Sequence, residues 1–135
     1  MRALVTLGPS LNPAQFVAPP NVRLEPFVPH AAVLPQAAAL VTQCGLSTLG
    51  KALAHGTPLV CLPILGDQPD NAARVVAREA GVRLARDASP EEIGWVIRRV
   101  LDEPHFRAGA QRLATVLAQE DGAETAAREL ASLSG

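Results

Sequence analysis

Residues 41–81 read VTQCGLSTLGKALAHGTPLVCLPILGDQPDNAARVVAREAG, and this stretch decides the fold class. Two apolar runs, 39–42 and 58–62, have the length and composition of buried strands. Each run is followed by a polar turn and then by apolar residues at helical spacing, over 47–55 and 69–80. Strands that alternate with helices through short connections are typical of parallel sheets covered on both faces. The sequence therefore predicts an α/β fold with a Rossmann-like, doubly wound parallel sheet.

The remainder of the chain extends this pattern, and residues 1–135 are expected to form one domain. The amino-terminal part predicts strands at 2–7 and 22–27, a surface loop over 10–21 and a one-turn helix at 29–34. A short strand is predicted at 82–84, and the pattern is then wholly helical, over 89–102, 106–119 and 123–133. Helix boundaries are indicated by the capping-box residues Ser89-Pro90-Glu91-Glu92 and by the glycines Gly56 and Gly81.

Composition excludes several classes of protein. The chain has 135 residues, 48% of them hydrophobic and 19% charged, which is enough for one domain with a sizeable core. A net charge of −1 gives no electrostatic reason to expect nucleic acid or an anionic membrane as a partner. No apolar run approaches the ~20 residues of a membrane span, so a cytoplasmic protein is expected.

The cysteines and histidines do not form metal or disulfide motifs. Two cysteines, Cys44 in the turn and Cys61 in an apolar strand, make neither a disulfide framework nor a CxxC pair, so both are expected to be free thiols of a cytosolic protein. His55 and His105 have no cysteine or carboxylate partner at ligand spacing. No metal site is expected.

The turn Gln43-Cys44-Gly45-Leu46-Ser47-Thr48 opens the first of the central helices. Backbone N–H groups at a helix start, together with the hydroxyls of Ser47 and Thr48, can hold a phosphate. Ser47 could instead serve only as the helix N-cap, and the two roles are compatible. The turn is therefore predicted to bind a phosphate group.

The loop Gly66-Asp67-Gln68 follows the next strand and supplies a carboxylate and an amide. Each of these groups can exchange more than one hydrogen bond with adjacent hydroxyls of a sugar. Asp67 could instead be only the N-cap of the helix that follows. Because the carboxyl ends of parallel strands share one sheet edge, a diphosphate site beside a sugar site predicts binding of a nucleotide sugar.

Taken together, these motifs resemble the donor-binding motif of family 1 glycosyltransferases, the UDP-glycosyltransferase-like group with a GT-B fold. The matching pieces are Phe27-Val28-Pro29-His30, the turn from Gln43 to Thr48, Gly56-Thr57-Pro58 and Asp67-Gln68-Pro69-Asp70-Asn71. The segments ALAHGTPLVCLP and DQPDNAARV are similar to those of bacterial macrolide and antibiotic glycosyltransferases in particular. The resemblance covers most of the chain and implies the carboxyl-terminal, donor-binding half of such an enzyme.

The resemblance also implies roles for single residues. The donor phosphates would be bound by Gln43, Gly45, Leu46, Ser47 and Thr48, the sugar by Asp67 and Gln68, and the base by Phe27, Val28 and His30. Asn71 is expected to brace its loop rather than to touch the ligand.

Two positions depart from the family pattern. Gln43 stands where the family has a phosphate-binding histidine; its amide still donates a hydrogen bond but brings no charge. Lys51 stands where plant members have a glutamate for the ribose hydroxyls, and a lysine accepts no hydrogen bond from them. Bacterial antibiotic-pathway members that use deoxythymidine sugars also depart from the pattern here, so the resemblance favours dTDP over UDP. Lys51 could instead be simply a solvated side chain of a helix. Trp95 is expected to pack or to face a partner.

The expected function is transfer of a hexosyl group from a UDP- or dTDP-sugar to a hydroxyl of a small molecule, by an inverting mechanism without a metal or other cofactor. One alternative is a truncated or auxiliary nucleotide-binding protein without catalysis, and a weaker one is a sugar-nucleotide epimerase of the GT-B fold. The family's catalytic base is a histidine of an amino-terminal domain, which none of the histidines here matches.

The family's carboxyl-terminal domain normally begins with a strand and a long helix that this sequence does not include. The acceptor-binding domain of the family and a base near the anomeric carbon are also missing from this sequence, so we expect the chain alone not to transfer sugar. We also expect an open sheet edge to be covered by self-association or by another polypeptide, because unpaired edge strands promote association.

Overall fold

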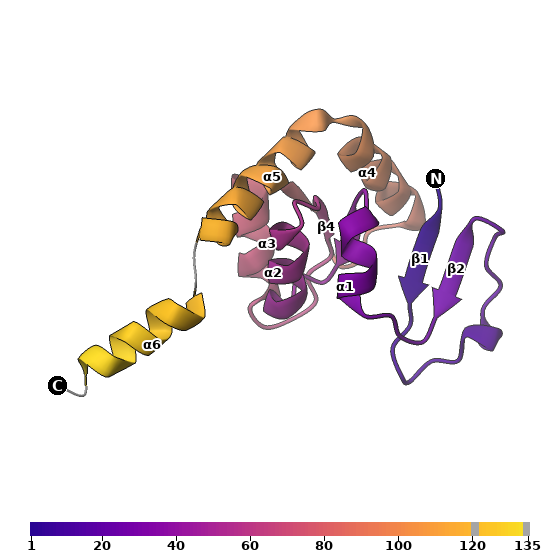
Figure 1. The fold of residues 1–135 in the computed structure, drawn as a ribbon. Coiled ribbons are helices and arrows are strands. Elements are labelled where there is room, and N and C mark those ends of the chain that lie inside the picture. Colours follow the sequence, from indigo (N-terminus) through magenta and orange to yellow (C-terminus); the bar gives the residue numbers. More distant parts are fainter. Residues whose placement is uncertain (120–121, 134–135) are drawn as a thin grey trace. The chain divides into compact units, whose positions relative to one another are not determined.

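A computed structural model describes residues 1–119 and 122–133 of the chain, the side chain of residue 123 excepted (Figure 1). The elements are, in order, β1 (Ala3–Thr6), a 3₁₀ turn (Pro13–Gln15), β2 (Val22–Glu25), α1 (His30–Val33), a second 3₁₀ turn (Leu34–Gln36), β3 (Leu40–Thr42), α2 (Leu46–Ala54), β4 (Leu59–Cys61), α3 (Gln68–Ala77), β5 (Gly81–Arg83), α4 (Pro90–Asp102), α5 (Pro104–Gln119) and α6 (Gly122–Ser132). The chain forms two compact units, Met1–Pro35 and Gln36–Gly135.

The first unit holds a two-stranded parallel sheet. β1 pairs with β2 in the register Ala3↔Val22 to Thr6↔Glu25. The connection contains a 3₁₀ turn that the sequence did not predict. It forms because the Asn12 side chain accepts a hydrogen bond from the Ala14 N–H at 3.0 Å, while Pro13 fixes the backbone at the first position. The unit ends in the short helix α1, which the sequence predicted.

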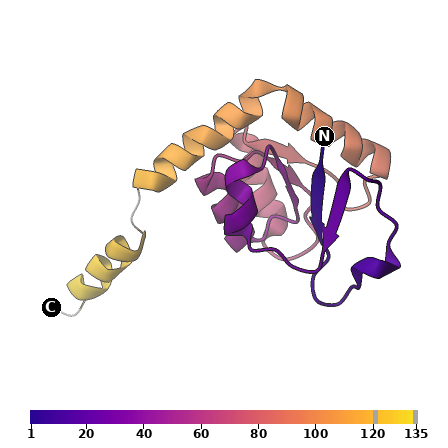
Figure 2. The ribbon, with the colours of Figure 1, turned by 45° about the vertical axis from the view of Figure 1, so that its right-hand side comes forward.

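The second unit is a three-layered α/β arrangement. Its sheet has the order β3-β4-β5, all parallel, with α2 and α3 as the connections (Figure 2). Val60 of β4 packs with Val96 and Val100 of α4 and with Phe106 of α5. Leu59 and Cys61 alternate to the opposite face, since neighbouring side chains of a strand point to opposite sides. The predicted doubly wound parallel fold is confirmed.

The end of α3 corrects the sequence prediction. The helix stops at Ala77 instead of residue 80, because Glu79 adopts a left-handed backbone with φ 56° and the Ala80 N–H donates to the Val75 carbonyl. Gly81 therefore does not end the helix but begins β5. A side chain there would run into the Leu59 carbonyl, so Gly81 is required for close packing of β5 on β4.

Other boundaries lie within two residues of those predicted. α2 starts at Leu46, one residue early, and ends before Gly56, whose φ of 63° confirms the predicted helix stop. α5 starts at Pro104 instead of residue 106, consistent with the preference for proline in a first helical turn. The capping box is present, with the Ser89 hydroxyl accepting from the Glu92 N–H at 3.2 Å.

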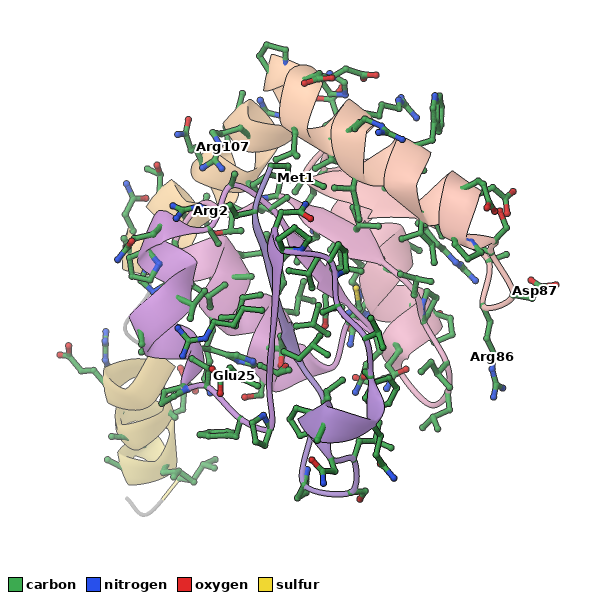
Figure 3. All side chains as sticks on the ribbon, turned by 90° about the vertical axis from the view of Figure 1, so that its right-hand side faces the viewer. Met1, Arg2, Glu25, Arg86, Asp87 and Arg107 are labelled. Carbon is green, nitrogen blue, oxygen red and sulfur yellow. The ribbon has the colours of Figure 1, made fainter. Side chains whose placement is uncertain are left out.

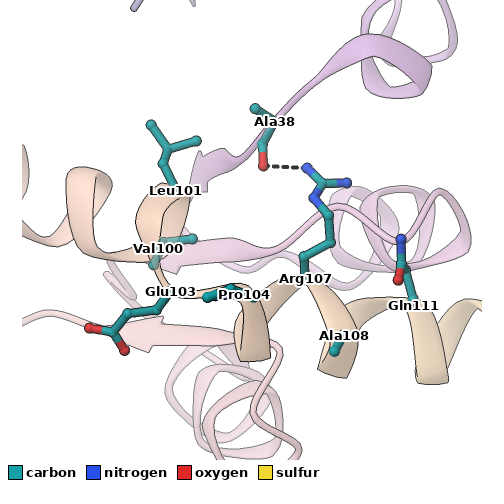
Figure 4. Close-up of a pocket in the computed structure, with 8 residues that line it drawn as sticks. All are labelled: Ala38, Val100, Leu101, Glu103, Pro104, Arg107, Ala108 and Gln111. Atoms are coloured by element: carbon teal, nitrogen blue, oxygen red, sulfur yellow. Dashed lines mark hydrogen bonds between the residues drawn. The ribbon is translucent and has the colours of Figure 1, made fainter.

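Arg107 of α5 fixes the edge of the sheet where the strands begin. Its guanidinium donates to the Ala38 carbonyl at 2.6 Å (Figure 4) and to the carbonyls of Ala37 and Gly56 at 3.4 Å. Ala38 precedes β3 and Gly56 precedes β4. This residue therefore stabilises the amino edge of the sheet, opposite the edge that carries the predicted site.

None of the helices in the described part of the chain is long and apolar enough to cross a membrane.

Candidate functional site at the carboxyl edge of the sheet

The turn after β3 presents the uncapped start of a helix. Cys44 adopts φ 68°, an uncommon conformation for a residue with a side chain, and its N–H donates to the Thr42 Oγ1 at 3.3 Å. Gly45 is the N-cap of α2, and no side chain caps the helix. The N–H groups of the first turn of α2 are thus left to solvent or to a ligand, and the positive end of the helix dipole favours an anion.

The hydroxyls predicted to bind phosphate lie in this first turn. Ser47 is exposed and Thr48 is half-buried. The alternative that Ser47 is the N-cap is wrong, because the cap is Gly45 and Ser47 lies inside the helix. Gln43 is exposed directly after β3, and Leu46 is also largely exposed. Their roles toward a ligand stay predictions.

The loop after β4 is shaped by Gly66 and Gln68. Gly66 has φ 64°, which glycine adopts without strain. The Gln68 Oε1 accepts hydrogen bonds from the N–H groups of Ile64 at 2.9 Å and Leu65 at 3.1 Å. The amide oxygen of Gln68 therefore holds the loop, and the role of its NH₂ group as a donor to a sugar stays a prediction.

Asn71 joins the loop to the turn. Its Nδ2 donates to the Cys44 carbonyl at 3.1 Å and to the Asp67 Oδ2 at 2.7 Å. Asp67 precedes α3 but its side chain makes no cap hydrogen bond. The two loops therefore meet at one sheet edge, as the sequence predicted, and Asn71 braces them.

Thr42 is a residue that the sequence prediction missed. Its hydroxyl supports the strained Cys44 backbone from the last position of β3. A threonine two residues before a non-glycine position of a tight turn is the signal that could have indicated it.

The two cysteines lie behind the turn. Both are free thiols, as predicted, and both have 0% exposure. A hydrogen bond between the thiols lowers the pKa of Cys44 and raises the pKa of Cys61, and burial raises the pKa of Cys61 further. These thiols form part of the core beneath the predicted phosphate turn, residues Gln43–Thr48.

The residues predicted to contact the base belong to the first unit. Phe27 follows β2 with 76% of its surface exposed, Val28 is half-buried, and His30 is the half-buried first residue of α1. An exposed aromatic face is available for stacking, and the base contact stays a prediction.

The structure also describes four other residues that the sequence singled out. Lys51 is exposed on α2, and His55 is the C-cap of the same helix. His105 Nδ1 lies 3.6 Å from the Glu103 carboxylate, and Trp95 is 61% exposed with the Arg99 guanidinium 5.8 Å from its ring. Among the described residues, no three histidine, cysteine, aspartate or glutamate side chains gather as a metal site would require.

The third loop of the carboxyl edge and the pocket at α5 differ from the candidate site. Arg86 and Asp87 project from the loop after β5, away from the sheet (Figure 3). A pocket of about 430 Å³ is lined by Ala38, Glu103 and Arg107 among others (Figure 4). This pocket lies at the amino edge of the sheet, where the Arg107 guanidinium already donates hydrogen bonds to backbone carbonyls. The uncapped start of α2 and the Gly66–Gln68 loop therefore remain the candidate site.

The fold and this edge define a class of protein, the carboxyl-terminal domains of GT-B glycosyltransferases. The chain belongs to the family described as "Erythromycin biosynthesis protein CIII-like, C-terminal domain", which matches residues 3–133.

Individual relatives agree with this membership. The chain is 45% identical over 104 residues to 4'-demethylrebeccamycin synthase of Lentzea aerocolonigenes, which covers 76% of the chain and 25% of the relative. It is 40% identical over 96 residues to 3-alpha-mycarosylerythronolide B desosaminyl transferase of Saccharopolyspora erythraea, covering 70% and 23%. The chain thus spans about a quarter of the length of these relatives.

A solved structure shows the same fold. The glycosyltransferase VinC in complex with dTDP matches with a TM-score of 0.81 and 29% identity, over 87% of this chain and 30% of that one. The predicted resemblance to bacterial antibiotic glycosyltransferases is confirmed.

Proposed function

We propose that the carboxyl edge of the β3-β4-β5 sheet binds a nucleotide sugar, as the donor half of an inverting glycosyltransferase. The acceptor is a hydroxyl of a small molecule, and the donor is a hexose linked to UDP or dTDP. The observation that carries the proposal is the uncapped start of α2 joined through Asn71 to the Asp67–Gln68 loop. The relatives' names, one of them a desosaminyl transferase, support it.

The chemistry follows from the groups at this edge. When an acceptor hydroxyl attacks the anomeric carbon, the bond to the nucleoside diphosphate breaks and negative charge grows on the diphosphate. We propose that the N–H groups of the first turn of α2 and the hydroxyls of Ser47 and Thr48 stabilise that charge, which the uncapped start of the helix supports. Because these donors are fixed before the reaction, we propose that no metal or other cofactor is needed. The catalytic base is proposed to come from outside this chain.

The nucleotide is proposed to be dTDP or UDP. VinC was solved with dTDP, and Lys51 on the exposed face of α2 offers no acceptor for ribose hydroxyls. Both features favour a deoxyribose nucleotide. Phe27, Val28 and His30 are the proposed base contacts, with Phe27 as the stacking face.

Calorimetric titration of the chain with UDP, dTDP, UDP-glucose and dTDP-glucose tests the proposal. Thr48→Val removes a hydroxyl from the first turn of α2 and should weaken dTDP binding about fivefold to tenfold, the scale of one neutral hydrogen bond. Thr115→Val is the matched control, because the Thr115 hydroxyl bonds to the Gln111 carbonyl within α5. Absence of binding to all four ligands, or equal effects of the two substitutions, would contradict the proposal.

A further inference from the structure

Asn71 is a buried polar residue in an otherwise apolar stripe of α3. It is 4% exposed, and its neighbours Ala72 and Val75 are 0% and 2% exposed. Burying an amide is unfavourable unless its hydrogen bonds are satisfied. The Asn71 NH₂ group satisfies both of its N–H groups at once, by donating to the Cys44 carbonyl and to the Asp67 carboxylate. The residue is therefore placed to transmit the position of one loop to the other.

Asp67 depends on this contact for its orientation. The residue is exposed, and its side chain makes no cap hydrogen bond to α3. In the part of the chain that the structure describes, Asn71 is the hydrogen-bond partner of the Asp67 carboxylate, at 2.7 Å. A short bond of this kind to a charged group is among the stronger hydrogen bonds. It fixes the Oδ2 atom and leaves the Oδ1 atom to accept from a ligand.

The phosphate turn has supports besides Asn71. The Cys44 N–H is held by the Thr42 hydroxyl at 3.3 Å, and the Leu49 N–H donates to the Gly45 carbonyl at 3.0 Å. Loss of the Asn71 side chain would therefore release the Asp67 carboxylate far more than it would disturb the turn.

We infer that Asn71 is a positioning residue of the donor site, which aims the Asp67 carboxylate at a hydroxyl of the donor sugar by anchoring it to the phosphate turn. This inference rests on the proposed function. It predicts that Asn71 acts on recognition of the sugar, through Asp67, rather than on recognition of the nucleoside diphosphate.

The test compares affinities for dTDP and dTDP-glucose, measured by calorimetry on the full 135-residue chain. The dissociation constant for dTDP divided by that for dTDP-glucose reports how much the sugar contributes to binding. Asn71→Ala should reduce that ratio about tenfold, because a charged hydrogen bond contributes roughly tenfold to a hundredfold in binding. The affinity for dTDP alone should change by less than about threefold. Asp67→Ala should reduce the ratio at least as much, and adding Asn71→Ala to it should cause no further loss.

Val75→Ala is the matched control, because it truncates a buried side chain of the same helix without touching either loop. It should lower thermal stability and leave the ratio unchanged. Equal weakening of dTDP and dTDP-glucose by Asn71→Ala would overturn the inference, as would additive effects of the two substitutions or a wild-type chain that binds both ligands equally. A wild-type chain that binds neither dTDP nor dTDP-glucose would overturn the proposed function itself, and the inference with it.

Discussion

At the scale of single residues, the side chain at position 43 is expected to set the affinity of the turn for an anion. Gln43 is exposed directly after β3, where the family has a histidine. Its amide can donate one neutral hydrogen bond to a phosphate, whereas an imidazolium would add a charge. The rest of the turn, with Gly45 as the N-cap and two hydroxyls in the first helical turn, is present. The difference between this chain and the family at this point is therefore expected in affinity rather than in geometry.

Gln43→His should strengthen binding of dTDP by up to about tenfold at pH 5.5 and have little effect at pH 8. A charged hydrogen bond contributes about 1.5–3 kcal/mol against about 1 for a neutral one, and histidine is charged below its pKa of about 6.5. Since phosphate stabilises the charged imidazole, the gain is present below that pKa and is lost as the pH rises. Calorimetry at both pH values measures it.

Gln119→His, at the exposed carboxyl end of α5, is the control for any general effect of pH on the nucleotide. An equal gain in both variants, or none in Gln43→His at pH 5.5, would show that no phosphate lies beside residue 43.

At the scale of elements, the packing of α5 against residues 78–79, which follow α3, depends on Gly109. A Cβ atom at Gly109 would overlap the Glu79 carbonyl and lie 2.8 Å from the Arg78 carbonyl oxygen. These carbonyls belong to the left-handed end of α3, so the backbone has little freedom to retreat. Gly94, inside α4, has the Arg98 guanidinium as its nearest neighbour at 3.7 Å, an ordinary contact.

Gly109→Ala should therefore destabilise the protein by about 1–3 kcal/mol, the usual cost of overpacking. Gly94→Ala should stabilise it by up to about 1 kcal/mol, because alanine favours a helix interior over glycine. Thermal or urea unfolding of the two variants beside the wild type measures both. The account of this packing fails if Gly109→Ala is as stable as Gly94→Ala.

At the scale of the whole molecule, the sequence predicted what depends on local periodicity and turn chemistry. The parallel strands, the order of the helices and the meeting of the two loops follow from apolar runs that end in glycine-containing turns. The end of α3 could not be predicted, because Gly81 resembles a helix stop, whereas it serves the contact with Leu59. The hydrogen bond from the Cys44 N–H to the Thr42 hydroxyl was missed because it depends on the unusual backbone of Cys44, and the threonine two residues earlier was the signal for it in the sequence.

The division into two units is also a property of the whole molecule. The residues predicted to bind phosphate and sugar belong to the second unit, whereas Phe27, Val28 and His30, the predicted base contacts, belong to the first. These residues were predicted from a family motif. A motif is matched position by position along the sequence, so the match does not depend on which unit contains each residue. Binding of the diphosphate and the sugar therefore tests the second unit by itself, and base selectivity tests the first.

The central claim is that the start of α2 holds the diphosphate of a nucleotide sugar. It is tested most directly by the amide ¹H–¹⁵N spectrum of the 135-residue chain during titration with dTDP. The largest saturable shifts should occur at the backbone amides of Leu46, Ser47 and Thr48, with a smaller shift at the Asn71 side-chain amide, because these N–H groups lie at the uncapped helix start and its brace. Shifts centred instead on the pocket around Arg107, or no shifts with millimolar dTDP, would contradict it.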